Sequence, residues 1–467
     1  MEDCTMHLKR YFVEGLAHAS YLIGADGEAA VVDPKRDVDD YLADAEREGL
    51  RIVAILNSHP HADFASGFRE LAQRTGAKIY ASHLAPAKYE HVAAKDGDRI
   101  TVGGLDVELL ETPGHSPDSL SFLVRESGRP EAIFTGDLLF VGDVGRPDLR
   151  DADEDPSALA GKLYDSLFHK ILALPDDVKI YPAHGAGSLC GRAISSAPFS
   201  LIGQERQFNW ALQIKDRAEF VRQMIANLPD RPAYFSYDVG VNLSGAKPLS
   251  ELPPLHALSE DDLTAAAAAG ATVIDTRSAP FFGAGHFPGS LNIGLGSALF
   301  STWVGFIVPG DTPIALVVGS ADNAPKARLE LARIGFDNVL GYIEADSLTR
   351  TQQLSQLSVC DLKSGIRRGT APLVLDVRTP GEWGKQHIEG ARHIPLPSLP
   401  ARLAEVPRDQ PVAVMCGSGY RSSIAASLLQ ARGFPQLQNV MGGMGAYTEA
   451  NCPAFEPAEL VFQSQNS

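Results

Sequence analysis

The stretch RIVAILNSHPHADF, residues 51–64, runs an apolar strand directly into two histidines and an aspartate. Three further apolar runs end in comparable residues: LDVELLETPG (105–114) leads to His115, EAIFTGD (131–137) ends on Asp137, and VKIYPAHG (178–185) contains His184. Loops at one end of a sheet can bring such side chains to a single point, where layered α/β folds build metal sites. The sequence therefore predicts a metal site at four strand ends.

Apolar runs that alternate with Gly, Pro and Asp turns predict strands between about residues 11 and 181. Between several of them apolar residues recur at helical spacing, as in DVDDYLADAEREG (37–49). This alternation predicts a mixed α/β domain. The pattern of residues 204–228 predicts one long helix, and the Pro and Gly residues of 243–255 place a domain boundary near residue 250.

The rest of the chain contains an internal repeat. VIDTRSAPFFGAGHFPGSLNI from Val273 recurs as VLDVRTPGEWGKQHIEGARHI from Val374, and PIALVVGS from Pro313 recurs as PVAVMCGS from Pro411. Two copies are too few for a solenoid, so they predict two copies of one α/β domain. The predicted domains are residues 1–250, 251–354 and 355–467.

Composition limits the class of protein. With 467 residues and roughly 150 per domain, about three domains are expected. Hydrophobic residues are 44% and charged residues 21%, which argues against a disordered or fibrous chain. The net charge of −17 opposes binding to nucleic acid or an anionic membrane. No apolar run reaches the roughly 18 residues of a membrane span, and the first residues lack a signal pattern, so a cytoplasmic location is expected.

Neutral imidazoles with a carboxylate suit zinc, iron or manganese, and their spacing does not choose the metal. Two histidines and one carboxylate with open positions form the facial arrangement of non-haem Fe(II) oxygenases. His18 and His83, by contrast, are expected to be ordinary strand-end histidines with satisfied hydrogen bonds.

At these residues the chain resembles the metallo-β-lactamase superfamily. Its H-x-H-x-D-H, G-H and G-D motifs are matched by residues 59–64, Gly114-His115 and Gly136-Asp137. The resemblance spans about the first 250 residues and implies an αββα sandwich. Phe64 stands where the last motif histidine belongs, so a second metal would lack a ligand, and a mononuclear site is expected instead of a two-zinc hydrolase.

Within that superfamily the chain most resembles the persulfide dioxygenase branch. The resemblance implies one Fe(II) per chain, with the ligands His59, His115 and Asp137. His61, Asp63 and His184 would then orient the ligands or bind water. Arg146 would contact an anionic thiol carrier, with a structural ion pair as the alternative.

The cysteines are odd in number and lack a C-x-x-C pair, so they predict neither a disulfide framework nor a zinc knuckle. They are Cys4, Cys190, Cys360, Cys416 and Cys452. Cys190 follows His184 in a Gly-rich loop, and similar loops in dioxygenases fused to sulfurtransferases imply a sulfur-relay role; inert packing is the alternative. Cys4, Cys360 and Cys452 are expected to be thiols without a role.

PVAVMCGSGYRSS, residues 411–423, predicts a strand ending at Cys416, a tight loop and a helix. The loop residues Gly417, Ser418, Gly419 and Tyr420 would bind a substrate anion with their N–H groups. Together with the helix dipole and Arg421 they would prepare Cys416 as a nucleophile.

The pattern C-x-x-G-x-R-S, with D-x-R upstream, resembles the rhodanese sulfurtransferases over about residues 360–460. In that family the loop cysteine carries a sulfane sulfur. Phosphatase relatives use C-x5-R, one residue longer, so sulfur transfer is favoured here. In the middle copy Val318 and Asn323 stand at the positions of Cys416 and Arg421, which predicts a rhodanese-like spacer or docking domain without this chemistry.

Both predicted sites act on sulfane sulfur, and their order resembles bacterial fusions of a persulfide dioxygenase with an inactive and an active rhodanese. The expected function is oxidation of a thiol persulfide of the glutathione or coenzyme A type by O2 to sulfite. Sulfur transfer at Cys416 would then form or use thiosulfate in sulfide detoxification, in a homodimer or homotetramer. Two alternatives are a zinc thioester hydrolase of the glyoxalase II type with an attached sulfurtransferase, and a non-enzymatic sulfur carrier.

Overall fold

The computed structural model describes residues 6–149, 155–226, 228 and 231–452, so Cys4 lies outside the described residues. The chain divides into two compact units. Unit 1 comprises residues 1–254, 297–312 and 325–339, and unit 2 comprises residues 255–296, 313–324 and 340–467. Within the described ranges, no helix combines the length and the apolar character needed to cross a membrane. The division into domains at residues 250 and 354 stays a prediction.

Unit 1 contains two six-stranded sheets. The first has the order β1 (His7–Val13), β2 (His18–Ala25), β3 (Glu28–Val32), β4 (Arg51–Leu56), β5 (Lys78–Ser82), β6 (Val92–Ala94). The second has the order β14 (Ser200–Leu201), β13 (Lys179–Pro182), β10 (Arg129–Gly136), β9 (Leu120–Glu126), β8 (Leu105–Glu111), β7 (Asp98–Val102). The predicted strands are therefore present.

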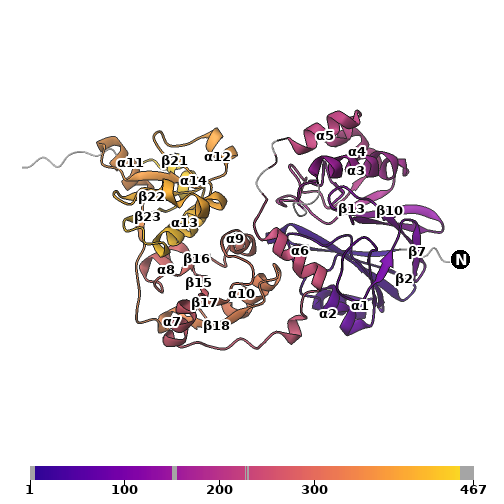
Figure 1. Cartoon of the computed structure of the whole chain (residues 1–467), viewed down its shortest axis with the longest axis horizontal. Helices are drawn as coiled ribbons and strands as arrows, with labels where there is room; N and C mark the ends of the chain where they lie inside the picture. Colours follow the sequence, from indigo (N-terminus) through magenta and orange to yellow (C-terminus); the bar gives the residue numbers. More distant parts are fainter. Residues whose placement is uncertain (1–5, 150–154, 227, 229–230, 453–467) are drawn as a thin grey trace, which may run out of the picture. The chain divides into compact units, whose positions relative to one another are not determined.

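Helices cover the outer faces of these sheets (Figure 1). The first sheet is covered by α1 (Asp39–Arg47) and α2 (Phe68–Thr75), which pack on it around Tyr41 and Phe68. The second sheet is covered by α3 (Pro156–His169), α4 (Ile202–Phe208) and α5 (Arg217–Ile225), which pack on it around Leu163 and Phe220. Side chains of both sheets, including Tyr21, Phe122 and Phe134, form the apolar layer between them. This arrangement confirms the predicted αββα sandwich.

Parallel pairing explains why the strand ends meet. β3, β4 and β5 are parallel neighbours, and β10 is parallel to β13. Both faces of β4 are covered: Ile52 and Ile55 pack under the helices, and Leu56 packs between the two sheets. The loops after β4, β8, β10 and β13 therefore open at one edge of the sandwich and carry the predicted metal ligands.

The prediction of one long helix over residues 204–228 is wrong. The segment forms α4, a short 3-10 turn at Ala211–Gln213 and α5. Asn209 ends α4 because its buried amide donates to the carbonyl of Asp143 and to the carboxylate of Glu205. Asp216 then caps α5 by accepting a hydrogen bond from the N–H of Glu219. Tertiary hydrogen bonds thus override an uninterrupted helical pattern.

Unit 2 contains the two repeat sheets. The middle copy has the order β16 (Leu291–Asn292), β15 (Thr272–Asp275), β17 (Ile314–Val318), β18 (Val339–Glu344). The C-terminal copy has the order β21 (Arg392–His393), β20 (Leu373–Asp376), β22 (Val412–Met415), β23 (Leu437–Val440), extended by β19 (Ser355–Leu357). The order is the same, and Asp275 pairs with Val317 as Asp376 pairs with Met415. The predicted repeat is confirmed.

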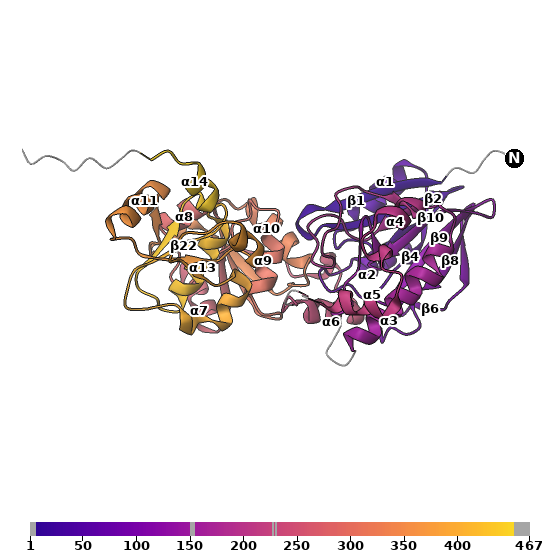
Figure 2. The ribbon, with the colours of Figure 1, turned by 90° about the horizontal axis from the view of Figure 1, so that it is seen from above.

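Helices complete each copy. The middle copy has α7 (Glu260–Ala268) and α8 (Ala279–Ala284), and its sequence continues with α9 (Phe300–Ile307) and α10 (Asn323–Ala332), of which α9 and most of α10 belong to unit 1. The C-terminal copy has α11 (Val359–Arg368), α12 (Pro380–Lys385), α13 (Tyr420–Ala431) and α14 (Gly443–Glu449). Figure 2 shows α11 and α14 on one side of β22 and α13 on the other. Leu362 and Met444 fill the core on the α11 side.

A disulfide joins Cys360 and Cys452, with 5.4 Å between their Cα atoms. The expectation that both are thiols is therefore wrong. The two residues are separated by 92 positions, and the packing of α11 on α14 brings them together. Lys363 reinforces this closure by donating to the carbonyl of Ala450. The spacing of the cysteines carried no signal of this contact.

The D-x-R element of each copy is a buried ion pair. Arg378 donates through Nε and Nη2 to the carboxylate of Asp376, with Nη2 at 2.6 Å, and also to the carbonyl of Gln386. Arg277 makes the same contacts with Asp275 and with the carbonyl of Gly285. The pair ties the end of one strand to the end of the next helix in both copies, so it is structural.

We expect Asp376→Asn to lower the free energy of unfolding by about 3 kcal/mol, because Arg378 would remain charged and buried without its carboxylate. Urea unfolding followed by circular dichroism measures this loss. Asp275→Asn makes the same change in the middle copy and is expected to destabilise that copy in the same sense. An Asp376→Asn protein that unfolds at the wild-type urea concentration contradicts the structural role.

Candidate functional site

Four strand ends of unit 1 deliver a buried cluster of polar side chains. His59 follows β4, His115 follows β8, Asp137 follows β10 and His184 follows β13, and all four are buried. One ligand atom from each of His59, His115 and Asp137 lies within 4.8 Å of the other two. The structure thus brings together the three residues that the resemblance implied as metal ligands.

The separations in this cluster suit a metal ion. Nε2 of His115 lies 3.5 Å from Oδ2 of Asp137, and Nε2 of His59 lies 3.8 Å from the same oxygen. Two ligands bound at about 2.1 Å to one ion stand roughly 3 to 3.5 Å apart, depending on the angle. Among the described residues, no donor forms a hydrogen bond to either oxygen of Asp137. A buried carboxylate in that state needs a cation.

Neighbouring groups orient the two histidines. Nδ1 of His115 donates to the carbonyl of Arg146 at 2.9 Å, which leaves Nε2 unprotonated toward Asp137. Nδ1 of His59 lies 2.9 Å from Oγ of Ser58. Burial lowers the pKa of His115, so the imidazole is neutral and able to bind a metal. Two imidazoles and a carboxylate fit iron or another divalent transition metal.

A second group of side chains lies beside this triad. Ligand atoms of Asp63, His184 and Cys190 lie within 4.8 Å of one another, as do those of His61, Asp137 and His184. Nε2 of His184 is 3.4 Å from Asp63 and 3.5 Å from Asp137. Burial opposes protonation of His184, but these two carboxylates raise its pKa. His61, Asp63 and His184 therefore adjoin the triad, as predicted.

Cys190 is buried next to these groups. Its backbone carbonyl accepts a hydrogen bond from the N–H of Arg146, which holds the Gly-rich loop against the site. Burial and the neighbouring carboxylates raise the pKa of the Cys190 thiol. The thiol is within reach of the metal-binding groups, and its sulfur-relay role stays a prediction.

Arg146 forms an ion pair. Its guanidinium is buried and donates through Nε and Nη2 to the carboxylate of Asp148, at 2.9 and 2.7 Å. Nη1 also lies 3.4 Å from the carbonyl of Leu189. The structure thus contains the ion pair that was the alternative to a contact with the thiol carrier. Contact of Arg146 with that carrier stays a prediction.

His18 differs from its expected role. His83 is satisfied as expected, by Glu111 at 2.9 Å. His18 is fully buried, stacks on Phe64 with 3.7 Å between ring centroids, and has no hydrogen-bond partner for either ring nitrogen within the described part of the chain. Burial lowers its pKa. The Phe64 ring therefore packs against both His18 and His61. From the sequence, Phe64 was expected only to remove one ligand of a second metal.

Asn242 is a positioning residue that sequence reasoning missed. It lies on α6 (Phe235–Ser244) and is buried. Its Nδ2 donates to the carbonyls of His61 and Phe64 at 2.8 and 2.7 Å, and its Oδ1 accepts from the N–H of Ser66 at 2.8 Å. One amide therefore holds the metal-binding loop at three points. No local pattern links a helix this far along the chain to that loop.

The loop after β22 surrounds the thiol of Cys416. The N–H of Gly419 donates to Sγ at 3.1 Å, and Oγ of Ser422 lies 3.4 Å from Sγ. Gly419 has a φ of 97°, which a residue with a side chain rarely adopts. The first N–H groups of α14 bind the carbonyls of Cys416 and Gly417 from behind. The loop therefore directs the N–H of Gly419 toward the sulfur, and the binding of a substrate anion by the other loop N–H groups stays a prediction.

The remaining loop residues have distinct contacts. Ser418 is exposed at the tip of the loop. The Tyr420 hydroxyl donates to the carbonyl of Gly294 in the middle copy at 3.0 Å. Arg421 is held by Glu382 of α12, with two bonds of 2.7 Å, and this contact raises the pKa of Arg421. Sequence reasoning did not foresee Glu382.

The middle copy lacks a thiol at the corresponding place. The shared sheet register puts Val318 at the position of Cys416, and α10 begins at Asn323. Instead, this copy supports the helix that follows the loop: Ser423 of α13 donates to Oδ1 of Asn292, and the N–H of Asn292 donates to Ser427. The middle copy thus holds α13 in place.

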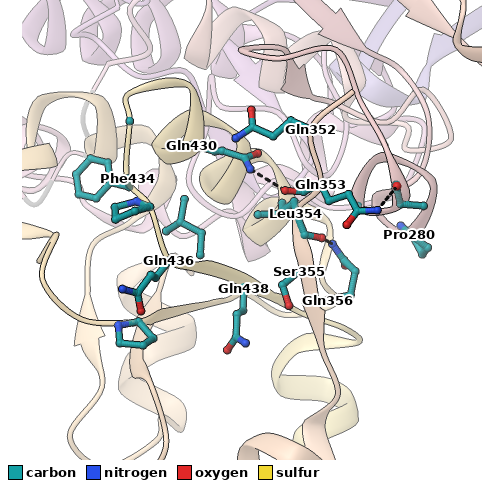
Figure 3. A pocket seen from close by; sticks show the side chains of 16 residues that line it. Pro280, Gln352, Gln353, Leu354, Ser355, Gln356, Gln430, Phe434, Gln436 and Gln438 are labelled. Atoms are coloured by element: carbon teal, nitrogen blue, oxygen red, sulfur yellow. Dashed lines mark hydrogen bonds between the residues drawn. The ribbon is translucent and has the colours of Figure 1, made fainter. Parts of the chain in front are cut away.

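A cleft of about 920 Å³ lies elsewhere in unit 2 (Figure 3). Six glutamines line it together with Pro280, Leu354, Phe434 and others: Gln352, Gln353, Gln356, Gln430, Gln436 and Gln438. Gln430 donates to the carbonyl of Gln353 across it. None of its lining residues carries an ionisable side chain or a thiol, so the cleft does not compete with the Cys416 loop as a site for sulfur chemistry.

Comparison with known proteins matches two regions of the chain. Residues 13–184 match the metallo-beta-lactamase superfamily, and residues 358–450 match the rhodanese-like domain. The mitochondrial persulfide dioxygenase ETHE1 of Bos taurus is 31% identical over 242 residues, which cover 50% of this chain and 87% of the relative. A hydroxyacylglutathione hydrolase of Francisella tularensis is 34% identical over 181 residues, 38% of this chain and 68% of the relative.

A solved structure extends further along the chain. The metallo-beta-lactamase from Staphylococcus aureus subsp. aureus COL superposes with a TM-score of 0.66 at 33% sequence identity. The superposition covers 73% of this chain and 99% of the other. The likeness therefore reaches beyond the residues that match the metallo-beta-lactamase superfamily.

We expect Asn242→Ala to weaken metal binding by roughly 10-fold to 100-fold, because the loop carrying His59 loses three hydrogen bonds. Titration of the metal-free protein with Fe(II) under anaerobic conditions measures the affinity. Ser244→Ala, an exposed change on the same helix, is the control and is expected to bind like the wild type. Equal affinity of the Asn242→Ala protein contradicts the positioning role.

Proposed function

Because the chain belongs to the metallo-β-lactamase superfamily and carries a rhodanese-like domain at residues 358–450, we propose that it is a persulfide dioxygenase joined to a sulfurtransferase. The observation that carries the first half is the buried triad His59, His115 and Asp137, with a carboxylate that no protein donor satisfies among the described residues. The observation that carries the second half is the Cys416 loop, in which the N–H of Gly419 donates to the sulfur.

Fe(II), one per chain, is the proposed metal, and when bound it supplies the site at which O2 can react with a persulfide. His59, His115 and Asp137 would hold it, and a metal with two histidines and one carboxylate would have further positions open for substrate. The carbonyl of Arg146 keeps Nε2 of His115 free of a proton, and Asn242 keeps the His59 loop in place. The protein therefore contributes orientation and a water-poor site.

The overall reaction consumes one O2 and one water. It converts the terminal sulfur of a persulfide to sulfite and releases the carrier as a thiol. The second group, His61, Asp63 and His184, adjoins the triad and can accept or return the protons that this reaction moves. Cys190 lies in the same group and is the proposed sulfur relay.

At the second site, the thiolate of Cys416 attacks a sulfane sulfur. The S–S bond of the donor breaks, the donor leaves with the electron pair, and Cys416 holds a persulfide. Attack of sulfite on that outer sulfur gives thiosulfate and restores the thiolate, and the reverse reaction uses thiosulfate as the donor. The N–H of Gly419, aimed at Sγ, stabilises the negative charge in each step.

The remaining parts of the proposed function rest on the sequence motifs and the family resemblance. The carrier thiol is of the glutathione or coenzyme A type, the reaction serves sulfide detoxification in the cytoplasm, and the chain forms a dimer or tetramer. Arg146 and the loop residues Gly417, Ser418, Gly419 and Tyr420 are the proposed substrate contacts.

A thioester hydrolase of the glyoxalase II type is the second candidate. The similarity to a hydroxyacylglutathione hydrolase favours it, as does the adjoining group of His61, Asp137 and His184, which offers donors for a second ion. Against it, Phe64 removes one donor from that group, and an attached sulfurtransferase has no evident use in thioester hydrolysis.

We expect the Fe(II)-loaded protein to consume O2 when glutathione persulfide is added, and His115→Ala to abolish the uptake because the triad loses a ligand. An oxygen electrode measures both. Hydrolysis of S-lactoylglutathione by zinc-loaded protein, without O2 uptake by the Fe(II)-loaded form, would establish the thioesterase instead.

We expect Cys416→Ser to leave the O2 uptake unchanged and to shift the product from thiosulfate to sulfite, because the hydroxyl cannot hold a persulfide. Ion chromatography of the reaction mixture separates the two anions. Ser320→Ala, an exposed change in the corresponding loop of the middle copy, is the control. Thiosulfate formed by the Cys416→Ser protein at the wild-type rate rules out the proposed transfer.

A further inference from the structure

The guanidinium of Arg421 at the Cys416 loop is already paired. Nη1 and Nη2 each donate to one oxygen of Glu382 at 2.7 Å, which is a bidentate contact. Glu382 is itself fixed, because its carboxylate accepts the N–H and hydroxyl of Thr379 at the start of α12. The contact with Arg421 lowers the pKa of Glu382 to about 2, so the pair is ionised at neutral pH.

This pair lies at the first residue of the loop. A β-carbon added to Gly417 would stand 3.1 Å from Nη2 of Arg421 and 3.5 Å from Oε1 of Glu382. Both charges are therefore within a few ångströms of the residue that follows the reactive thiol. Their sum is zero, so the attraction of the loop for an anion comes from backbone N–H groups and the helix end.

The middle copy serves as an internal comparison. It keeps the buried pair Asp275–Arg277, which is structural in both copies. At the positions of Glu382, Cys416 and Arg421, however, it has Phe281, Val318 and Asn323, and Phe281 is exposed. The fold therefore does not need the Glu382–Arg421 pair, because a copy with the same sheet order lacks it. Of the two copies, only the one that has the Cys416 thiol also has the Glu382–Arg421 pair.

Resting on the proposed sulfurtransferase activity, we propose that Glu382 is a specificity-determining residue that selects the sulfur donor of Cys416. By holding and neutralising Arg421, it disfavours thiosulfate, which brings two negative charges into the loop. It favours thiol persulfides, which bring at most one. The sulfane sulfur of a persulfide is therefore the preferred source for Cys416.

The selected step is the first sulfur transfer. The thiolate of Cys416 forms a bond to the outer sulfur of R–S–S⁻ or R–S–SH, the S–S bond of the donor breaks, and R–S⁻ or R–SH leaves. With thiosulfate the same attack releases sulfite, and the loop must hold three negative charges at once, counting the thiolate. The carboxylate of Glu382 opposes that accumulation, whereas Arg421 alone would favour it.

The test is a single-turnover measurement with the full chain. Cys416 persulfide formation is followed by mass spectrometry after mixing with glutathione persulfide or with thiosulfate, and Cys416→Ser is the blank. In Glu382→Gln the rate constant with thiosulfate is expected to rise roughly tenfold relative to that with the persulfide. Glu389→Gln, an exposed carboxylate further along the same segment, is the matched control and keeps the wild-type ratio.

A second measurement uses the wild-type protein alone. Added salt is expected to raise the wild-type rate with thiosulfate, because it screens the repulsion between the thiolate and the dianion, and to raise it less in Glu382→Gln, where the unpaired Arg421 offsets that repulsion. A wild-type rate that falls steeply with salt overturns the inference, as does a Glu382→Gln protein in which both donors slow equally. If wild-type Cys416 takes sulfur from neither donor, the proposed sulfurtransferase itself is wrong.

Discussion

The arrangement of unit 1 depends on one buried carboxylate, that of Asp137. Both oxygens of Asp137 lack a hydrogen-bond donor among the described residues, yet three imidazole nitrogens stand 3.5 to 3.8 Å away. Such a charge costs several kcal/mol, on the order of a buried unpaired ion, unless a cation neutralises it. The two sheets, the parallel strand ends and the clamp from Asn242 all bring donors to this one point.

The repeat in unit 2 separates structure from chemistry. What the two copies share, the strand order and the Asp–Arg pair at each first strand, is what any copy needs to fold. Only the C-terminal copy has Cys416 with Arg421 and Glu382, the residues to which the proposed sulfur transfer is assigned. The middle copy has no thiol at that place and contacts α13 through Asn292 and Gly294.

The two candidate sites differ in their electrostatic setting. The candidate metal site is buried and lined by imidazoles and carboxylates, a setting that favours a bound cation. At the Cys416 loop the N–H of Gly419 donates to the sulfur, and the guanidinium of Arg421 nearby is neutralised by Glu382. Both free cysteines of the described chain, Cys190 and Cys416, lie at these two places.

The sequence by itself determined the sandwich, the repeat and the residues of both candidate sites, because strand periodicity and motif spacing are properties of neighbouring residues. Only the tertiary structure decided which distant groups support them: Asn242 behind the metal loop, Glu382 on Arg421, and the disulfide between Cys360 and Cys452. It also broke the helical pattern of residues 204–228 at Asn209. These features depend on contacts between residues far apart in the chain, and local patterns do not encode such contacts.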